Sequence, residues 1–353
     1  MRAGGTWRGS PLGRPAKEPG ELPPLRKLVL PGLFIALLFG ALIVRRPEPP
    51  PPPPDLTELN GQVFGTTFTI KVVGEADGAA LAVAVDETLS AIDASMSTWK
   101  PDSELSRLNA AGTEPFAVSP ELVEVLELSG GVWASSMGAF DPTVGPLVDL
   151  WGFGSKGREL PEPTEEQLAE VVLGFDGVGI APDAVTKRDA AIRIDLSAVA
   201  KGWAVDQLAE ELQAAGHADY LVEIGGEVRV GGTKAGQPWI LGVENPAGGV
   251  WTQVQLLDAA LATSGDYRNV VRGKSHTIDP RTRRPVTHQL ASVSVVADTC
   301  GLADAWATAL TVMGPDDGLA TAEAVGLDAL FLVRTDAGFE ERTTSSFEAL
   351  RVR

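Results

Sequence analysis

The pattern of apolar and polar positions changes its period between residues 292 and 314. Residues 292–296 alternate small and β-branched side chains, as a strand does, and residues 300–313 then follow a helical pattern rich in Ala and Leu. Asp304 and Thr308 are four residues apart in this predicted helix, so they share one of its faces. A carboxylate and a hydroxyl placed in this way are hard oxygen ligands that suit Mg²⁺ better than Zn²⁺. The pair is equally consistent with an acid that faces the helix dipole and a hydroxyl used in packing.

The rest of the pattern mixes helices and strands without a regular βαβ alternation. Loops rich in polar, Gly and Pro residues separate the elements, which favours a single α+β body of largely antiparallel strands and helices. Strands are predicted at residues 62–73, 190–195, 220–232, 239–244, 252–257 and 329–333. Helices are predicted at residues 81–96, 104–109, 120–136, 160–176, 200–212 and 319–325.

The first 55 residues have a different pattern from the body that follows. Residues 1–27 are polar and basic without apolar periodicity, which predicts a disordered cytoplasmic tail. Residues 28–44 are an uncharged apolar run, at the short end for a transmembrane helix. Residues 45–55 form a Pro-rich linker, extended at about 3 Å per residue. The body, residues 56–353, is then expected on the extracytoplasmic side of a bacterial cytoplasmic membrane.

A cleaved signal peptide is the alternative to this membrane anchor. No small-x-small cleavage site follows the apolar run, and no cysteine follows it that could carry a lipid. An uncleaved anchor is therefore the favoured interpretation.

Charge and composition narrow the possible functions of the body. The chain has a net charge of −18, of which residues 1–54 contribute +5, so the body carries −23. Such an acidic body repels nucleic-acid phosphates, and a phosphorylated ligand would need a metal ion or local donors. Cys300 is the single cysteine, which excludes an internal disulfide, and three histidines make a His-built zinc site a poor hypothesis.

Two further segments carry candidate chemistry. Lys201 and Gly202 open a predicted helix, where an ammonium group and backbone N–H groups would suit an anion, and a surface lysine that caps the helix start is an equally good interpretation. His276 and Asp279 could form a base and the group that orients it, although an exposed histidine is commoner. Residues 225–226 are two glycines that interrupt a strand pattern, but they lack the GxGxxG spacing of a dinucleotide fold.

Several separated segments together resemble the conserved blocks of one family, the FAD:protein FMN transferases, or ApbE family. The resemblance covers residues 62–333, nearly the whole body. The blocks are residues 64–67, 96–109, 138–153, 195–206, 224–227, 262–269, 276–285 and 303–314, in the family's order. The resemblance implies an enzyme that binds FAD and Mg²⁺, transfers FMN through a phosphoester bond to a threonine or serine hydroxyl of an acceptor flavoprotein, and releases AMP.

The resemblance also implies roles for individual residues in metal binding and catalysis. Asp304 and Thr308 match the family's side-chain metal ligands, and the backbone carbonyl of Ala198 would be the third metal ligand that the protein supplies. The ion would bridge phosphate oxygens as a Lewis acid, and with Lys201 it would allow an acidic body to hold an anionic dinucleotide. His276 matches the family's loop histidine, which would position the acceptor hydroxyl or assist its deprotonation. Asp304 and His276 are thus the expected catalytic residues.

The flavin-binding residues follow from the same matches. Met96, Ser97 and Thr98 match the block that lines the flavin, and Asp141 and Asp266 match loop acids that bond ring or ribose groups. The expected FAD-binding set is Met96, Ser97, Thr98, Asp141, Lys201, Glu223, Asp266 and His276.

The sequence departs from the family pattern at four positions. Phe64 stands where Met is frequent and Trp99 where Tyr is frequent, and both keep an apolar or aromatic surface. Glu223 stands where Asn is common, which would change a flavin contact. Arg283 occupies the place of Gly in the DPRTG pattern, where a positive φ would cost energy and alter the His276 loop.

Three alternatives remain open on the sequence. An FAD pyrophosphatase would use the same site with water as the nucleophile and release FMN and AMP. A membrane-tethered flavin-binding protein would bind FAD without catalysis. A purely structural tethered module would leave the ordered blocks unexplained. Product analysis with and without an acceptor would distinguish the first two from transfer.

Overall fold

The structure is a computed structural model that describes residues 55–154, 161–266, 270–271 and 273–352. The chain divides into two units, Met1–Pro52 and Pro53–Arg353, and only the second is described here. The expected tail, anchor and linker at residues 1–54 therefore lie outside the described residues. Within the described residues, no helix is both long enough and apolar enough to cross a membrane.

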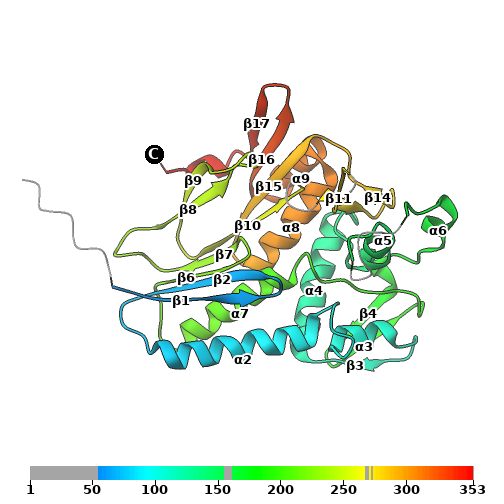
Figure 1. Cartoon of the computed structure of the whole chain (residues 1–353), viewed down its shortest axis with the longest axis horizontal. Helices are drawn as coiled ribbons and strands as arrows, with labels where there is room; N and C mark the ends of the chain where they lie inside the picture. The colour runs from blue at the N-terminus through cyan, green and yellow to red at the C-terminus, as the bar shows by residue number, and fades with distance from the viewer. Residues whose placement is uncertain (1–54, 155–160, 267–269, 272, 353) are drawn as a thin grey trace, which may run out of the picture. The chain divides into compact units, whose positions relative to one another are not determined.

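In the described part of the chain, eight strands form one sheet in the order β1-β2-β6-β7-β10-β15-β16-β17 (Figure 1). Every neighbouring pair is antiparallel, which confirms the predicted α+β class with largely antiparallel strands. The strands are β1 (Leu56–Val63), β2 (Thr66–Val73), β6 (Tyr220–Ile224), β7 (Glu227–Gly231), β10 (Ala259–Gly265), β15 (Leu290–Ala297), β16 (Asp328–Thr335) and β17 (Gly338–Thr343).

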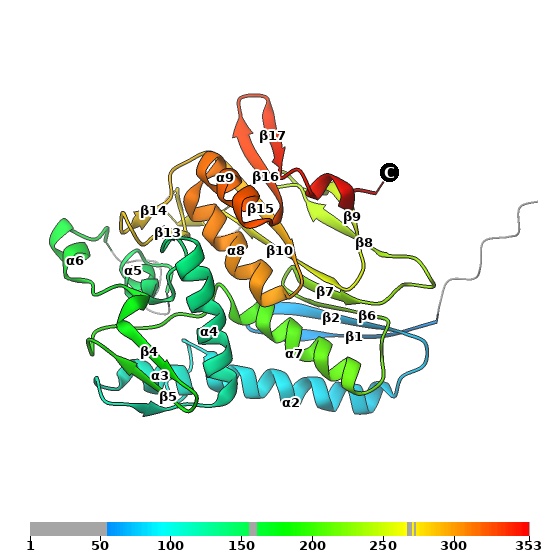
Figure 2. The ribbon, with the colours of Figure 1, turned by 180° about the vertical axis from the view of Figure 1, so that it is seen from behind.

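Helices cover one face of this sheet, as Figure 2 shows. Strand side chains such as Ile70, Val72 and Val295 point to this face and are fully buried in the main hydrophobic core. Burial of such side chains supplies most of the stability of amphipathic helices packed on a sheet. The covering helices are α2 (Gly78–Met96), α7 (Ala200–Ala214), α8 (Cys300–Met313) and α9 (Pro315–Val325).

A two-stranded hairpin packs on the opposite face of the sheet. It consists of β8 (Trp239–Glu244) and β9 (Val250–Leu256). Its inward side chains, among them Leu241 and Val254, form a second apolar cluster with sheet residues that include Leu330. The sheet therefore lies between a helical layer and this hairpin.

The segment between α2 and α7 builds a smaller lobe beside the sheet (Figure 1). Its three-stranded sheet has the order β3-β5-β4, and Leu147, Trp151, Leu168 and Ile278 form a third buried cluster. The elements of this lobe are α3 (Glu104–Ala110), β3 (Phe116–Ala117), α4 (Pro120–Ser135), η1 (Pro142–Val144), α5 (Gly145–Leu150), α6 (Glu165–Glu170), η2 (Phe175–Gly177), β4 (Val178–Ala181) and β5 (Ala184–Lys187).

The other described elements are short. Two small hairpins follow β10, and a single 3₁₀ turn precedes the C-terminus. They are β11 (Val270–Val271), β12 (Lys274–Ser275), β13 (Ile278–Asp279), β14 (Arg284–Pro285) and η3 (Phe347–Leu350).

The close approach of α7 and α8 depends on two glycines. A Cβ atom added to Gly202 would lie 2.4 Å from the carbonyl oxygen of Cys300, and one added to Gly301 would lie 3.3 Å from the backbone nitrogen of Trp203. Larger residues would push the helices apart, because neither backbone can move freely. This approach brings the first turn of α7, with Lys201, next to the first turns of α8, with Asp304.

Three sequence predictions of secondary structure were wrong. The single strand predicted at residues 62–73 is the β1–β2 hairpin, whose turn residues Phe64 and Gly65 have φ values of 51° and 78°. Residues 190–195 do not form a strand, and the helix predicted at residues 160–176 shortens to α6.

The backbone near residue 194 is satisfied without a neighbouring strand. The side-chain oxygen of Asn109 accepts a hydrogen bond from Ile194 N at 2.7 Å, and its side-chain nitrogen donates to Ile194 O, also at 2.7 Å. One amide side chain thus replaces the ladder that an apolar, extended segment would otherwise need.

Candidate functional site

A cavity of about 1060 Å³ lies at the edge of the main sheet, between the sheet and the smaller lobe. The β6–β7 turn, the end of β10, the first turns of α7 and α8, and the loop after α4 all contribute to its wall. The predicted site residues in its lining are Thr98, Asp141, Ala198, Lys201, Glu223, His276, Asp304 and Thr308.

Lys201 lies between two buried carboxylates in this wall. Its Nζ is 2.6 Å from Oε1 of Glu227, and Asp304, which is 6% exposed, accepts a hydrogen bond from the backbone N–H of Gly202 at 3.3 Å. Burial by itself lowers the pKa of Lys201, but Asp304 and Glu227 outweigh it and hold this pKa above its usual value. The two carboxylates therefore favour the charged form of Lys201 in the cavity.

Burial acts on the two carboxylates in the opposite direction from Lys201, because it disfavours the charged form of each group. Burial raises the pKa of Asp304, and Lys201 and the N–H of Gly202 counteract it. Burial also raises the pKa of Glu227, to about 7, with Lys201 lowering it and Asp304 raising it further. Such clusters of perturbed groups in a cavity are typical of functional sites.

Sequence reasoning did not single out Glu227. It lies in the block 224–227, directly after two glycines, and it is 4% exposed. Among the described residues, its Oε2 atom has no hydrogen-bond partner although it is buried. In the sequence, Glu227 is only an acid at an inward position of a predicted strand. Its role becomes clear from its contact with Lys201 in the structure.

The oxygen donors in the wall fit a Mg²⁺ ion of the expected kind. The carboxylate of Asp304, the hydroxyl of Thr308 and the backbone at Ala198 all line the cavity. The described residues include no group of three or more His, Cys, Asp or Glu side chains that could hold a metal. A site with one carboxylate suits Mg²⁺, which commonly keeps waters and substrate phosphates as its other ligands.

Asp141, from a loop of the smaller lobe, and His276, from the turn between β12 and β13, contribute to the wall. The Oδ1 atom of Asp141 accepts hydrogen bonds from the backbone N–H of Thr143 at 2.8 Å and from its hydroxyl at 2.6 Å, which caps η1. Burial raises the pKa of Asp141, and these hydrogen bonds oppose the rise. The ring of His276 lies edge-on to Phe153, with 6.4 Å between ring centroids.

Three of the expected flavin-binding residues are not among those that line the cavity. Met96 is 5% exposed and belongs to the main core, and Ser97 accepts hydrogen bonds from the backbone of Trp99 and Lys100 at 3.3 Å. Asp266 forms an ion pair with Arg334. Ser97 and Asp266 are adjacent in sequence to the lining residues Thr98 and Gly265, and Met96 lies two residues before Thr98. The role of all three in flavin binding stays a prediction.

Arg283 keeps the turn that glycine would form in the His276 loop. Its φ is 61°, a conformation that costs a non-glycine residue about 1 kcal/mol. Its guanidinium group donates to the carbonyl oxygens of Leu168, Ala169 and Val171 at the end of α6, and its own carbonyl accepts from the indole N–H of Trp151 at 3.0 Å. These bonds offset the strain of the positive φ, and the effect of Arg283 on the geometry of the His276 loop stays a prediction.

Comparisons with known proteins give a consistent result. The model of the ApbE family matches residues 64–331. The FAD:protein FMN transferase of Vibrio cholerae is 41% identical over 304 residues, which is 82% of this chain and 91% of the relative. The FAD:protein FMN transferase of Haemophilus influenzae is 38% identical over 313 residues, 83% and 90% of the two chains. The solved structure of the flavin transferase ApbE from V. cholerae matches with a TM-score of 0.79 at 40% identity, covering 84% of this chain and 100% of that one.

Proposed function

The chain belongs to the ApbE family and is a flavin transferase, and we propose that it transfers FMN from FAD to a threonine or serine hydroxyl of an acceptor flavoprotein in a Mg²⁺-dependent reaction that releases AMP. The observation that carries this proposal is the grouping of Lys201, Asp304 and Thr308 in one cavity. Transfer of a phosphoryl group from a pyrophosphate to a hydroxyl needs neutralised phosphate charge and an aligned hydroxyl more than it needs covalent chemistry from the protein.

Each of these side chains has a part in the proposed reaction. Asp304, Thr308 and the carbonyl of Ala198 would hold Mg²⁺, which when bound supplies Lewis-acid neutralisation of the pyrophosphate. Lys201, fixed by Glu227, would bind the phosphate oxygens of FAD. The acceptor oxygen would form a bond to the phosphorus of the FMN half, and the bond from that phosphorus to the AMP phosphate would break. His276 would take the proton of the acceptor hydroxyl.

The test uses the full chain in detergent with FAD, Mg²⁺ and candidate acceptor flavoproteins from the same organism. A denaturing gel should show a fluorescent acceptor band that disappears with EDTA. A dark band with AMP and free FMN in solution would support the pyrophosphatase instead. A dark band with intact FAD would support a binding protein without catalysis.

Asp304→Ala is the first variant for this assay. Transfer should fall by at least about 100-fold, because the ion loses its only carboxylate and the charge on the phosphates is no longer neutralised. Asp298→Ala is the matched control, since Asp298 is an exposed acid just before α8 and should leave transfer unchanged. Activity of Asp304→Ala close to that of the wild type would refute the metal assignment.

We also propose that residues 28–44 anchor the chain in the cytoplasmic membrane with its catalytic body on the extracytoplasmic side. The apolar run and the basic residues before it support this arrangement. In cells with a permeabilised outer membrane, added protease should digest the body, while an intact inner membrane protects a cytoplasmic marker. Resistance of the body under these conditions would refute the proposed orientation.

A further inference from the structure

In the part of the chain that the structure describes, one edge of strand β8 has no neighbouring strand. In the described part of the chain, β8 pairs with β9 and with no other strand. An uncovered edge presents a row of backbone N–H and C=O groups, which can pair with an extended peptide.

The orientation of these groups follows from the pairing on the other side of the hairpin. The backbone N–H of Val352 donates to Gln253 O at 3.1 Å, so the polar groups of Gln253 point away from β8. Gly242 is the partner of Gln253 in the ladder, so its N–H and C=O point away from β9, toward the uncovered edge. Ile240 lies two residues earlier without a register shift, so it has the same orientation.

The uncovered edge borders the functional cavity. Leu241, Gly242 and Glu244 line this cavity, while the indole of Trp239 at the other end of β8 donates to Gly231 O at 3.0 Å. The strand therefore runs toward the cavity. The cavity lining continues over the open sheet face through Thr69, Lys71, Leu221 and Val228.

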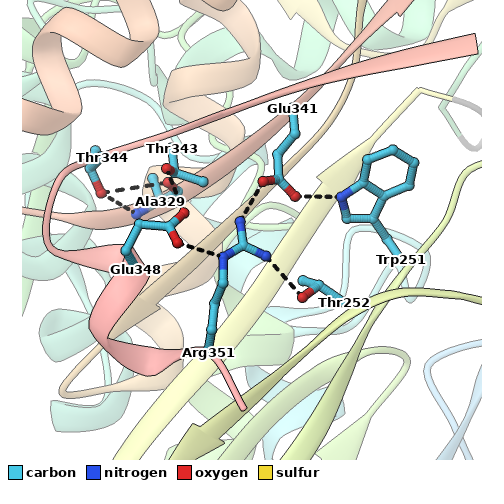
Figure 3. A network of polar contacts seen from close by, with 8 residues as sticks. All are labelled: Trp251, Thr252, Ala329, Glu341, Thr343, Thr344, Glu348 and Arg351. Carbon is cyan, nitrogen blue, oxygen red and sulfur yellow. Dashed lines mark hydrogen bonds and ion pairs between the residues drawn. The ribbon is translucent and has the colours of Figure 1, made fainter. Parts of the chain in front are cut away.

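The hairpin is fixed from the side opposite this edge. The guanidinium group of Arg351 bonds to Glu341, to Glu348 at 2.9 Å and to the hydroxyl of Thr252 at 2.9 Å, and Glu341 also accepts from the indole of Trp251 (Figure 3). These contacts connect β9 to β17 and to the C-terminal turn. A strand added to β8 would meet a preorganised edge, which lowers the cost of binding.

We infer that the acceptor protein docks by adding an extended segment to the free edge of β8. This inference rests on the proposed function, which requires a polypeptide hydroxyl to enter the cavity. A segment paired with β8 would lead from the Trp239 end to the cavity end near Glu244. Main-chain pairing does not depend on charge complementarity, so it is compatible with a body whose charge is −23.

Amide-resolved hydrogen exchange tests the docking directly. The full chain is mixed, with EDTA present to prevent turnover, with an acceptor flavoprotein that the wild-type chain labels in the transfer assay. The amides of Ile240 and Gly242 should become protected, whereas those of Leu241 and Val243, which face β9, should be protected already. No protection by the acceptor, or the same protection by FAD alone, would overturn the inference.

Ile240→Pro provides the kinetic test. It removes one N–H group from the free edge, where proline is tolerated, and Ile240 is 56% exposed. The KM for the acceptor should rise about three- to tenfold, the value of one backbone hydrogen bond, with FAD affinity unchanged. Ile240→Ala keeps the N–H group and should change this KM less than about twofold.

The outcomes separate this inference from the proposed function. An unchanged acceptor KM in Ile240→Pro, or a weaker affinity for FAD, would overturn the docking mode while transfer itself stands. If the wild-type chain labels no acceptor, the proposed function fails and the docking inference fails with it.

Discussion

At the scale of single residues, substitution of Glu227 should have the clearest measurable effect on the rate of transfer. Its carboxylate is buried against Lys201 and is not a proposed metal ligand. Glu227→Gln keeps the shape but removes the charge that holds the ammonium group. We expect kcat/KM for transfer to fall about 10- to 100-fold, because a hydrogen bond between charged groups contributes about 1.5–3 kcal/mol.

Glu210→Gln is the control for this variant. Glu210 lies in α7, as Lys201 does, but it is not among the residues that line the cavity, and its side chain is 57% exposed, with Oε1 3.8 Å from Arg229. Its effect should stay below about threefold. Equal losses in the two variants would show that the overall charge of the protein, and not the contact with Lys201, controls the rate.

The sequence predicted the proposed metal ligands more completely than it predicted the residues that hold Lys201 in place. Asp304 and Thr308 could be paired from their spacing, because a helical period places them on one face. Glu227 could not be paired with Lys201, because the contact joins strand β7 to helix α7, two elements that only the tertiary fold brings together. Asp279 was considered as a partner of His276, but its carboxylate bonds to the backbone and guanidinium group of Arg281 at 2.9 Å.

At the scale of secondary-structure elements, the N-terminus of α8 is capped by a neighbouring helix. The residue before the helix, Thr299, makes no side-chain cap. Instead, Asp206 of α7 accepts hydrogen bonds from the backbone N–H groups of Cys300 and Gly301, both at 2.8 Å, and it pairs with Arg229 at 2.8 Å. Local sequence rules look for a cap next to the helix, so they could not find this one.

Asp206→Ala should therefore destabilise the protein by about 2–3 kcal/mol, because two buried N–H groups lose their acceptor. The measurement is urea unfolding of the wild type and the variant. Asp176→Ala is the control, because Asp176 forms an exposed pair with Arg188 and should cost less than about 1 kcal/mol. A loss at Asp206 no larger than at Asp176 would contradict the capping role.

The sequence predicted secondary-structure elements best where apolar side chains recur at a regular spacing on the face that packs against the core. Residues 300–313 match α8 because apolar side chains recur on its buried face. Residues 190–195 have an apolar, β-branched composition, but their backbone bonds to the side chain of Asn109 instead of to a strand. A hydrogen bond between a side chain and a distant backbone segment leaves no periodic pattern in the sequence, so it could not be predicted.

At the scale of the whole molecule, His288, in the loop between β14 and β15, connects this loop to α8 and makes stability depend on pH. Its Nε2 atom bonds to the carbonyl oxygen of Thr311 at 2.8 Å, and its Nδ1 atom accepts from the backbone N–H of Leu290 at 3.3 Å. The neutral ring with its proton on Nε2 satisfies both bonds, and a doubly protonated ring would lose the second. Burial lowers the pKa of His288 below its usual value, an effect that the bond to Thr311 counteracts in part.

A histidine whose pKa is lower in the folded protein stabilises the fold above the unfolded pKa of about 6.5 and loses this contribution as the pH falls toward the folded value. The contribution of His288 to the free energy of unfolding should thus decrease below pH 6.5, by at most about 1.4 kcal/mol per pH unit. Glu227, whose pKa burial raises to about 7, contributes with the opposite sign, but it does so in the wild type and in His288→Gln alike. Urea unfolding of both proteins at several pH values between 7.5 and 5, roughly the range over which histidine titrates, measures the difference. Relative to His288→Gln, the wild type should lose stability as the pH falls, and equal slopes in the two proteins would assign the pH dependence to other groups.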